Sequence, residues 1–130
     1  MSGIENRESA TATPAEERPV YLAIVGSRDY PNLDRVRRFV ESLPSNTIVV
    51  SGGARGVDRC AATAARARGL RVIEFLAEWR RLGRSAGFVR NEKIVRQCDR
   101  MVAFWDGSSP GTRNSISLAR RSGRPVDIHP

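Results

Sequence analysis

The sequence is poor in lysine, cysteine and histidine. Lysine occurs once, at Lys93, and arginine supplies the rest of the 22 positively charged side chains. Cys60 and Cys98 stand in separate helix-like segments without a CxxC spacing, which predicts two reduced, structural thiols rather than a zinc site or a thioredoxin-type motif. We expect no metal and no cofactor. The one histidine, His129, lies in the C-terminal tail, where we expect it to be incidental.

Long apolar runs are also missing. No segment approaches the roughly 20 apolar residues that cross a bilayer, which argues against a membrane role. Residues 1–19 are acidic, rich in small residues and without the apolar stretch of a signal peptide. We interpret them as a disordered tail of a cytoplasmic protein. The remaining residues, 20–130, are enough for one domain with a hydrophobic core and too few for two.

Negative charge is outweighed, since the formal net charge is +8. Such a balance is compatible with nucleic acid or a phosphate-rich ligand as partner. Arginine-rich, solvated helix faces that arise from compositional bias explain it equally well. Aromatic residues make up only 6% of the chain, and no basic patch with interleaved aromatics is visible. Nucleic acid therefore ranks below a small molecule as the expected partner.

Short apolar runs that alternate with helical periodicity predict the fold. The predicted strands are residues 21–26, 47–51, 71–75 and 100–105, with a fifth, edge strand at 125–128. The predicted helices follow from about Leu33, Val57, Val89 and Thr112, and residues 76–88 are interpreted as a functional loop. This alternation indicates a single Rossmann-like α/β domain with about five strands, mainly parallel, and helices on both faces.

Glycine, serine, arginine and aspartate follow the predicted strands at one rim of the sheet, where open α/β sheets bind ligands. The segment SGGARGVD, residues 51–58, places three glycines between a strand and a helix, so that backbone N–H groups can converge on a phosphate. The alternative is that the glycines only make the turn. The candidate ligand-binding residues of this segment are Ser51, Gly52, Gly53, Ala54, Gly56 and Asp58.

Asp58 has two interpretations of equal weight. Its carboxylate can accept hydrogen bonds from ribose hydroxyls, or it can lie in the first helical turn and interact with the helix dipole. After the first strand, Gly26, Ser27 and Arg28 are candidates to reach over the ligand, with Arg28 pairing with phosphate, and the alternative is a turn with an exposed arginine.

Two further segments complete the predicted site. Arg90 and Asn91 open the third predicted helix, where an arginine would face a bound anion. The turn DGSSPGT offers a second phosphate or ribose site or, alternatively, a plain helix cap; its candidate residues are Asp106, Gly107, Ser109, Gly111 and Thr112. Trp79 and Trp105 are candidates to stack on a base, although packing against the sheet is the commoner role of such a tryptophan.

Together these segments resemble the SLOG superfamily, the Rossmann-like group that includes the Smf/DprA recombination mediators and the LOG cytokinin-activating phosphoribohydrolases. The resemblance covers about residues 21–126 and rests on four ordered motifs: VGSRDY, VVSGGARGVDRCA, AEWRRLGRSAGFVRNEKIV and DGSSPGT. Within the superfamily the chain is most similar to the small stand-alone YspA/YpsA-related branch. The resemblance implies a nucleotide or nucleotide-derived ligand, and homodimers are common among such relatives.

One departure from the LOG pattern bears on catalysis. The turn before the last helix resembles the PGGxGTxxE motif, with Gly111 and Thr112 in the GT positions, but Ser115 stands at the position of the catalytic glutamate. Serine cannot supply a carboxylate, so the resemblance implies binding more firmly than hydrolysis. The candidates for a catalytic role in its place are Asp58, Arg90, Glu92 and Asp106.

Three functions follow from these patterns. The first is a sensor or binding domain for a nucleotide-derived ligand. The second is a nucleoside 5′-monophosphate phosphoribohydrolase, an N-glycosidic-bond hydrolase of the LOG kind. The third is single-stranded DNA binding of the DprA kind. The sequence does not decide whether the protein is an enzyme.

Overall fold

The structure is a computed structural model and describes residues 18–130. The predicted tail lies outside this range except for its last two residues. The elements are, in chain order, β2 (Val20–Gly26), α1 (Leu33–Glu41), β3 (Thr47–Ser51), α2 (Val57–Ala67), β4 (Arg71–Glu74), α3 (Trp79–Leu82), η2 (Gly83–Ser85), α4 (Ala86–Gln97), β5 (Arg100–Phe104), α5 (Pro110–Arg121) and β6 (Val126–His129). In this part of the chain no helix is long and apolar enough to cross a membrane.

The strands form one five-stranded sheet in the order β4-β3-β2-β5-β6, and all neighbouring strands are parallel. The predicted Rossmann-like α/β fold is confirmed, including β6 as an edge strand. The chain moves from β2 to β3 and β4 on one side, and then crosses to β5 and β6 on the other. The strand order thus reverses between β2 and β5, where a ligand crevice is expected.

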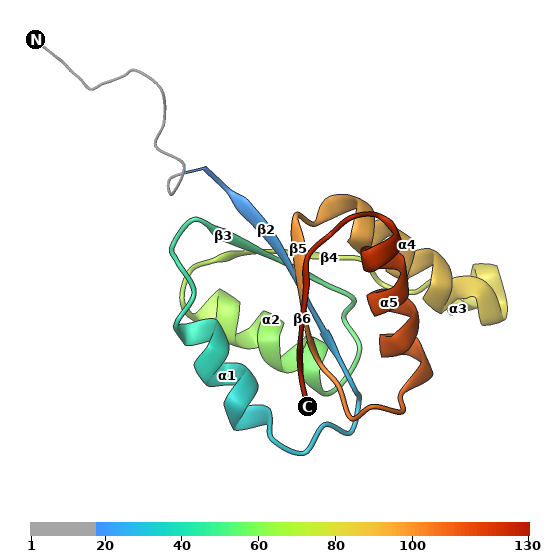
Figure 1. The fold of residues 1–130 in the computed structure, drawn as a ribbon, viewed down its shortest axis with the longest axis horizontal. Coiled ribbons are helices and arrows are strands. Elements are labelled where there is room, and N and C mark those ends of the chain that lie inside the picture. The colour runs from blue at the N-terminus through green and yellow to red at the C-terminus, as the bar shows by residue number, and fades with distance from the viewer. Residues whose placement is uncertain (1–17) are drawn as a thin grey trace, which may run out of the picture.

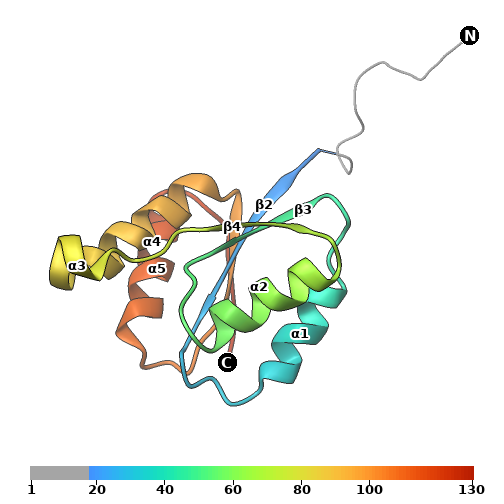
Figure 2. The ribbon, with the colours of Figure 1, turned by 180° about the vertical axis from the view of Figure 1, so that it is seen from behind.

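Helices cover both faces of the sheet (Figures 1 and 2). One core cluster joins β2, β3 and β5 to α1 and α2, and it includes Ile24, Val36 and Val57. The second joins the opposite face of the same strands to α4 and α5, through residues such as Ile94 and Ile116. The central strands therefore bury both faces, as their continuous apolar runs predict.

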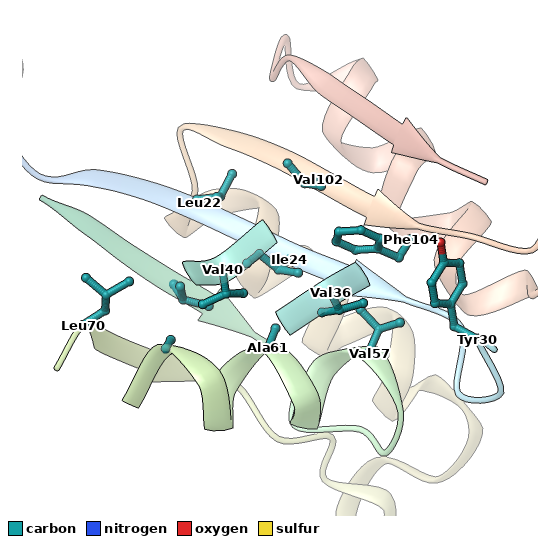
Figure 3. Close-up of a cluster of buried hydrophobic side chains, with 12 residues drawn as sticks. Leu22, Ile24, Tyr30, Val36, Val40, Val57, Ala61, Leu70, Val102 and Phe104 are labelled. Carbon is teal, nitrogen blue, oxygen red and sulfur yellow. The ribbon is translucent and has the colours of Figure 1, made fainter. Parts of the chain in front are cut away.

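Phe104, at the end of β5, belongs to the first cluster and lies beside Tyr30 (Figure 3). Its ring contacts Tyr30 and Phe39 edge-on, at centroid distances of 5.7 and 5.6 Å, and stacks on His129 at 4.8 Å. His129 Nδ1 also lies 3.2 Å from Nη2 of Arg35. The interpretation of His129 as an incidental tail residue is therefore wrong, because the side chain packs β6 against α1.

The segment predicted as a loop between β4 and the third helix differs from expectation. It contains the short helix α3 and the 3-10 turn η2, and α4 begins at Ala86 rather than at Val89. Arg90 and Asn91 consequently lie in the second turn of α4 and do not open it. Gly83, with φ of 58°, ends α3, whereas Gly87 lies inside α4 and does not prevent that helix from forming.

Candidate functional site

A cavity of about 430 Å³ lies at the carboxyl end of β2, where the strand order reverses. Four segments line it: the loop after β2, the start of α2, the α3–α4 region and the amino end of α5. The predicted site residues among the lining are Gly26, Ser27, Arg28, Ala54, Asp58, Trp79, Arg90, Asn91, Ser109, Gly111 and Thr112. The other predicted residues, Ser51, Gly52, Gly53, Gly56, Glu92, Asp106 and Gly107, do not line it.

The glycine-rich loop between β3 and α2 is folded upon itself. The N–H of Gly53 donates to Ser51 Oγ at 3.2 Å, and the N–H of Ala54 donates to Asp58 Oδ2 at 3.2 Å. Gly56 has φ of 82°, and a Cβ placed there would lie 2.3 Å from the carbonyl oxygen of Arg28. These amides and glycines thus serve the close packing of the loop, which reaches the cavity through Ala54 and Asp58.

Asp58 is a buried carboxylic acid at the wall of the cavity, with 6% of its surface exposed. Burial raises its pKa to about 6 by desolvating the carboxylate, against the opposing effects of the Ala54 N–H, Arg90 and Arg28. Burial likewise lowers the pKa of Arg90, while the nearby Asp58 carboxylate opposes that change. The cavity wall therefore holds a carboxyl group that titrates near neutral pH.

Asp58→Asn is expected to remove a pH dependence of stability. The folded-state pKa of about 6 exceeds the ordinary 3.8, so the native protein binds this proton more tightly than the unfolded chain. The contribution of Asp58 is fully present below about pH 4 and is lost as the pH rises through about 6, a change of about 2–3 kcal/mol. Urea unfolding of both proteins across this window should show the wild type losing stability relative to Asp58→Asn. If the difference in unfolding free energy between the two proteins stays constant across this pH range, the raised pKa of Asp58 is contradicted.

Asp106 makes the turn before α5. Its Oδ1 accepts the N–H groups of Ser108 and Ser109, both at 2.9 Å, and these amides lower its pKa to about 2. The carboxylate therefore stays ionised and bound within the turn, outside the cavity lining. Glu92, the third carboxylate among the predicted catalytic candidates, is exposed on α4 and also lies outside the lining.

Arg90 is held in place from two sides. Its Nη1 donates to the carbonyl oxygen of Gly52 at 2.6 Å, and its Nε donates to Asn91 Oδ1 at 2.9 Å. A Cβ at Gly52 would lie 2.9 Å from both Arg90 Nη1 and Asp58 Oδ2, so glycine allows the two charged groups to flank it. Guanidinium and carboxyl groups are thereby fixed side by side at one wall.

Aromatic side chains stand at the same cavity. Trp79 and Phe88 line it although 52% and 57% of their surfaces are exposed. Trp105 does not line it; its Nε1 donates to the Ser109 carbonyl oxygen at 3.2 Å and Arg113 lies over its ring, so it has the packing role.

Sequence reasoning missed Phe88 and Arg84 as site residues. The missed signal is helical spacing. Gly87, Phe88 and Asn91 follow Arg84 by three, four and seven residues, which places all four on the same side of the segment formed by η2 and α4. Among residues 18–130, no cluster of three or more His, Cys, Asp or Glu side chains is suited to a metal.

Comparison with known proteins agrees with this architecture. Residues 20–82 match the model of the YspA, cpYpsA-related SLOG family (YAcAr). This match places residues 20–82 in the SLOG superfamily. No curated protein matches the sequence of this SLOG chain.

Two solved structures share the SLOG fold of this chain. DNA processing protein A (DprA) from Streptococcus pneumoniae aligns with a TM-score of 0.74 at 22% identity, over 88% of this chain and 51% of that one. DprA from Helicobacter pylori, in a study of its single-stranded DNA binding mode, aligns with a TM-score of 0.65 at 19% identity, over 88% and 67%. The SLOG chain thus spans about half the length of the S. pneumoniae protein. At these identities, the similarities establish a shared fold and nothing further.

Proposed function

We propose that this SLOG domain binds a nucleotide or nucleotide-derived ligand in the cavity at the end of β2 and acts as a binding or sensing domain. The observation that carries the proposal is the joint placement of Arg28 and Arg90 with Trp79 and Phe88 around one cavity of about 430 Å³. Arginine pairs with phosphate, aromatic rings stack on bases, and the volume falls in the range of small-molecule sites.

The amino end of α5 supports a phosphate position in the cavity. Gly111 and Thr112, in the first turn of this helix, line the cavity, and N–H groups of a first helical turn lack intrahelical partners. Arg90 reaches the same cavity from α4. A phosphate between the amino end of α5 and Arg90 would meet positive partial charge on one side and full charge on the other.

Binding without hydrolysis is favoured by the carboxylates. Ser115 stands at the position of the LOG glutamate and lines the cavity, whereas Glu92 and Asp106 lie outside the lining. Hydrolysis is the second candidate because Asp58, which does line the cavity, has a pKa of about 6. A carboxylic acid that titrates near the working pH is suited to proton transfer.

Single-stranded nucleic acid is a third candidate. Trp79 and Phe88 are exposed beside Arg80 and Arg84, which combines stacking surfaces with positive charge. The sequence alone shows no such interleaving, because Phe88 lies several residues from Trp79 and is brought near it by α3, η2 and α4. The predicted homodimer and the small-molecule partner remain parts of the proposal.

Isothermal titration against nucleoside monophosphates, ADP-ribose and cyclic nucleotides tests the proposed function. We expect saturable binding of at least one compound, with adenosine and inorganic phosphate each binding more weakly than the nucleotide that joins them. Chromatography of the same mixtures for free base separates binding from hydrolysis, and titration of a labelled oligonucleotide at increasing salt tests nucleic-acid binding. If the folded protein binds no compound of the panel, the proposal is wrong.

A further inference from the structure

We infer that Asn91 and Asn114 are positioning residues, which hold Arg90 at a fixed distance from the amino end of α5 and thereby set the affinity of the cavity for the anionic part of its ligand. This inference rests on the proposed function. It assigns a role to Asn114, which lies outside the cavity lining, and gives Asn91 a role other than direct ligand contact.

The side-chain amide of Asn91 is buried between α4 and α5, with 5% of the residue exposed. Its Oδ1 accepts from Arg90 Nε at 2.9 Å, and its Nδ2 donates to Asn114 Oδ1 at 2.9 Å and to the carbonyl oxygen of Gly111 at 3.4 Å. The orientation of the amide is settled by its partners, since the guanidinium only donates and the Gly111 carbonyl only accepts.

These bonds connect two walls of the cavity. Arg90 belongs to α4 and Gly111 to the first turn of α5, and the two helices pack side by side on one face of the sheet (Figures 1 and 2). Asn114 lies one turn further along α5 and receives the second Asn91 bond. A shift of α5 relative to Arg90 would break these bonds, so the amide pair fixes the separation of the two groups that face an anion.

The network also determines which donors Arg90 can offer. With Nε bound to Asn91 and Nη1 bound to Gly52, Nη2 and the second hydrogen of Nη1 remain for a ligand. A guanidinium held on two sides loses less conformational entropy when it binds an anion. Removal of the amide pair should therefore weaken binding of the phosphate without removing a ligand contact.

A double-mutant cycle with AMP as the probe tests the inference. Asn114→Leu removes the acceptor at similar size, and we expect the AMP affinity to fall about fivefold, as for loss of one neutral amide–amide hydrogen bond. In the Arg90→Met background the same change should have little further effect, because Asn114 acts through Arg90. Ser117→Ala, on the exposed face of α5, is the control and should leave the affinity unchanged.

The NMR signal of the Arg90 Nε–H group supplies a readout that does not depend on a ligand. We expect a slowly exchanging signal in the wild type and in Asn114→Asp, which retains an acceptor, and faster exchange in Asn91→Ala and Asn114→Leu. Equal AMP affinity for wild type and Asn114→Leu, or additive effects in the cycle, would overturn the positioning role while the proposed function stands. If the wild type binds no nucleotide, both fail, and the NMR signal then shows whether the amide pair orders Arg90 at all.

Discussion

Phe104→Ala is expected to lower the free energy of unfolding by about 4 kcal/mol. Phe104 has no exposed surface and is the largest fully buried side chain in the described part of the protein. Its removal leaves a cavity between β5 and α1 and abolishes three aromatic contacts, with Tyr30, Phe39 and His129. Each such pair contributes about 0.5–1.5 kcal/mol beyond area burial.

Phe88→Ala is the matched control for Phe104→Ala. It makes the same chemical change at a position that is 57% exposed, so we expect a loss of less than about 0.5 kcal/mol. Urea unfolding gives both losses, provided that the slope of unfolding free energy against urea concentration is the same for the variants and the wild type. Phe104→Leu supplies the measurement if the alanine variant is too unstable to fold. Equal losses at the two positions would show that the ring of Phe104 is not part of the core.

The sequence predicts the sheet well because buried parallel strands carry a continuous apolar signal. Strand β3, with the sequence TIVVS, begins and ends at the predicted residues. All five of its residues are buried, so charged side chains would be unfavourable there and the apolar run marks the strand clearly. Helix α3 gives no such signal. It has four residues, none of them buried, so nothing in its side-chain pattern distinguishes it from a loop.

The candidate site could be predicted at the level of segments but not of contacts. Strand ends gather at one rim by topology alone, and Arg28, Asp58, Arg90 and Thr112 do line the same cavity. Which way the backbone amides of the glycine-rich loop point depends on the side chains of Ser51 and Asp58, which take the N–H groups of Gly53 and Ala54. The spacing of the glycines does not show that these side chains compete with a ligand for the backbone N–H groups.

Arg90→Met is expected to weaken nucleotide binding by about 100-fold. Loss of charge-assisted hydrogen bonds costs about 1.5–3 kcal/mol, and each 1.4 kcal/mol is tenfold in affinity. The substitution keeps an unbranched, flexible side chain but removes the donors to the ligand, to Gly52 and to Asn91. Binding of adenosine should change little, because it lacks the phosphate. Calorimetric titration with AMP and with adenosine measures both effects.

Two further variants make the Arg90 result specific to the guanidinium. Arg96→Met removes an exposed arginine from the same helix, outside the cavity, and should leave AMP binding within about twofold, since surface charges are screened by salt. Arg90→Lys keeps the charge but not the planar fork, so an intermediate loss is expected. If Arg90→Met and Arg96→Met weaken binding equally, the effect comes from the net charge of the protein, and Arg90 does not hold the phosphate.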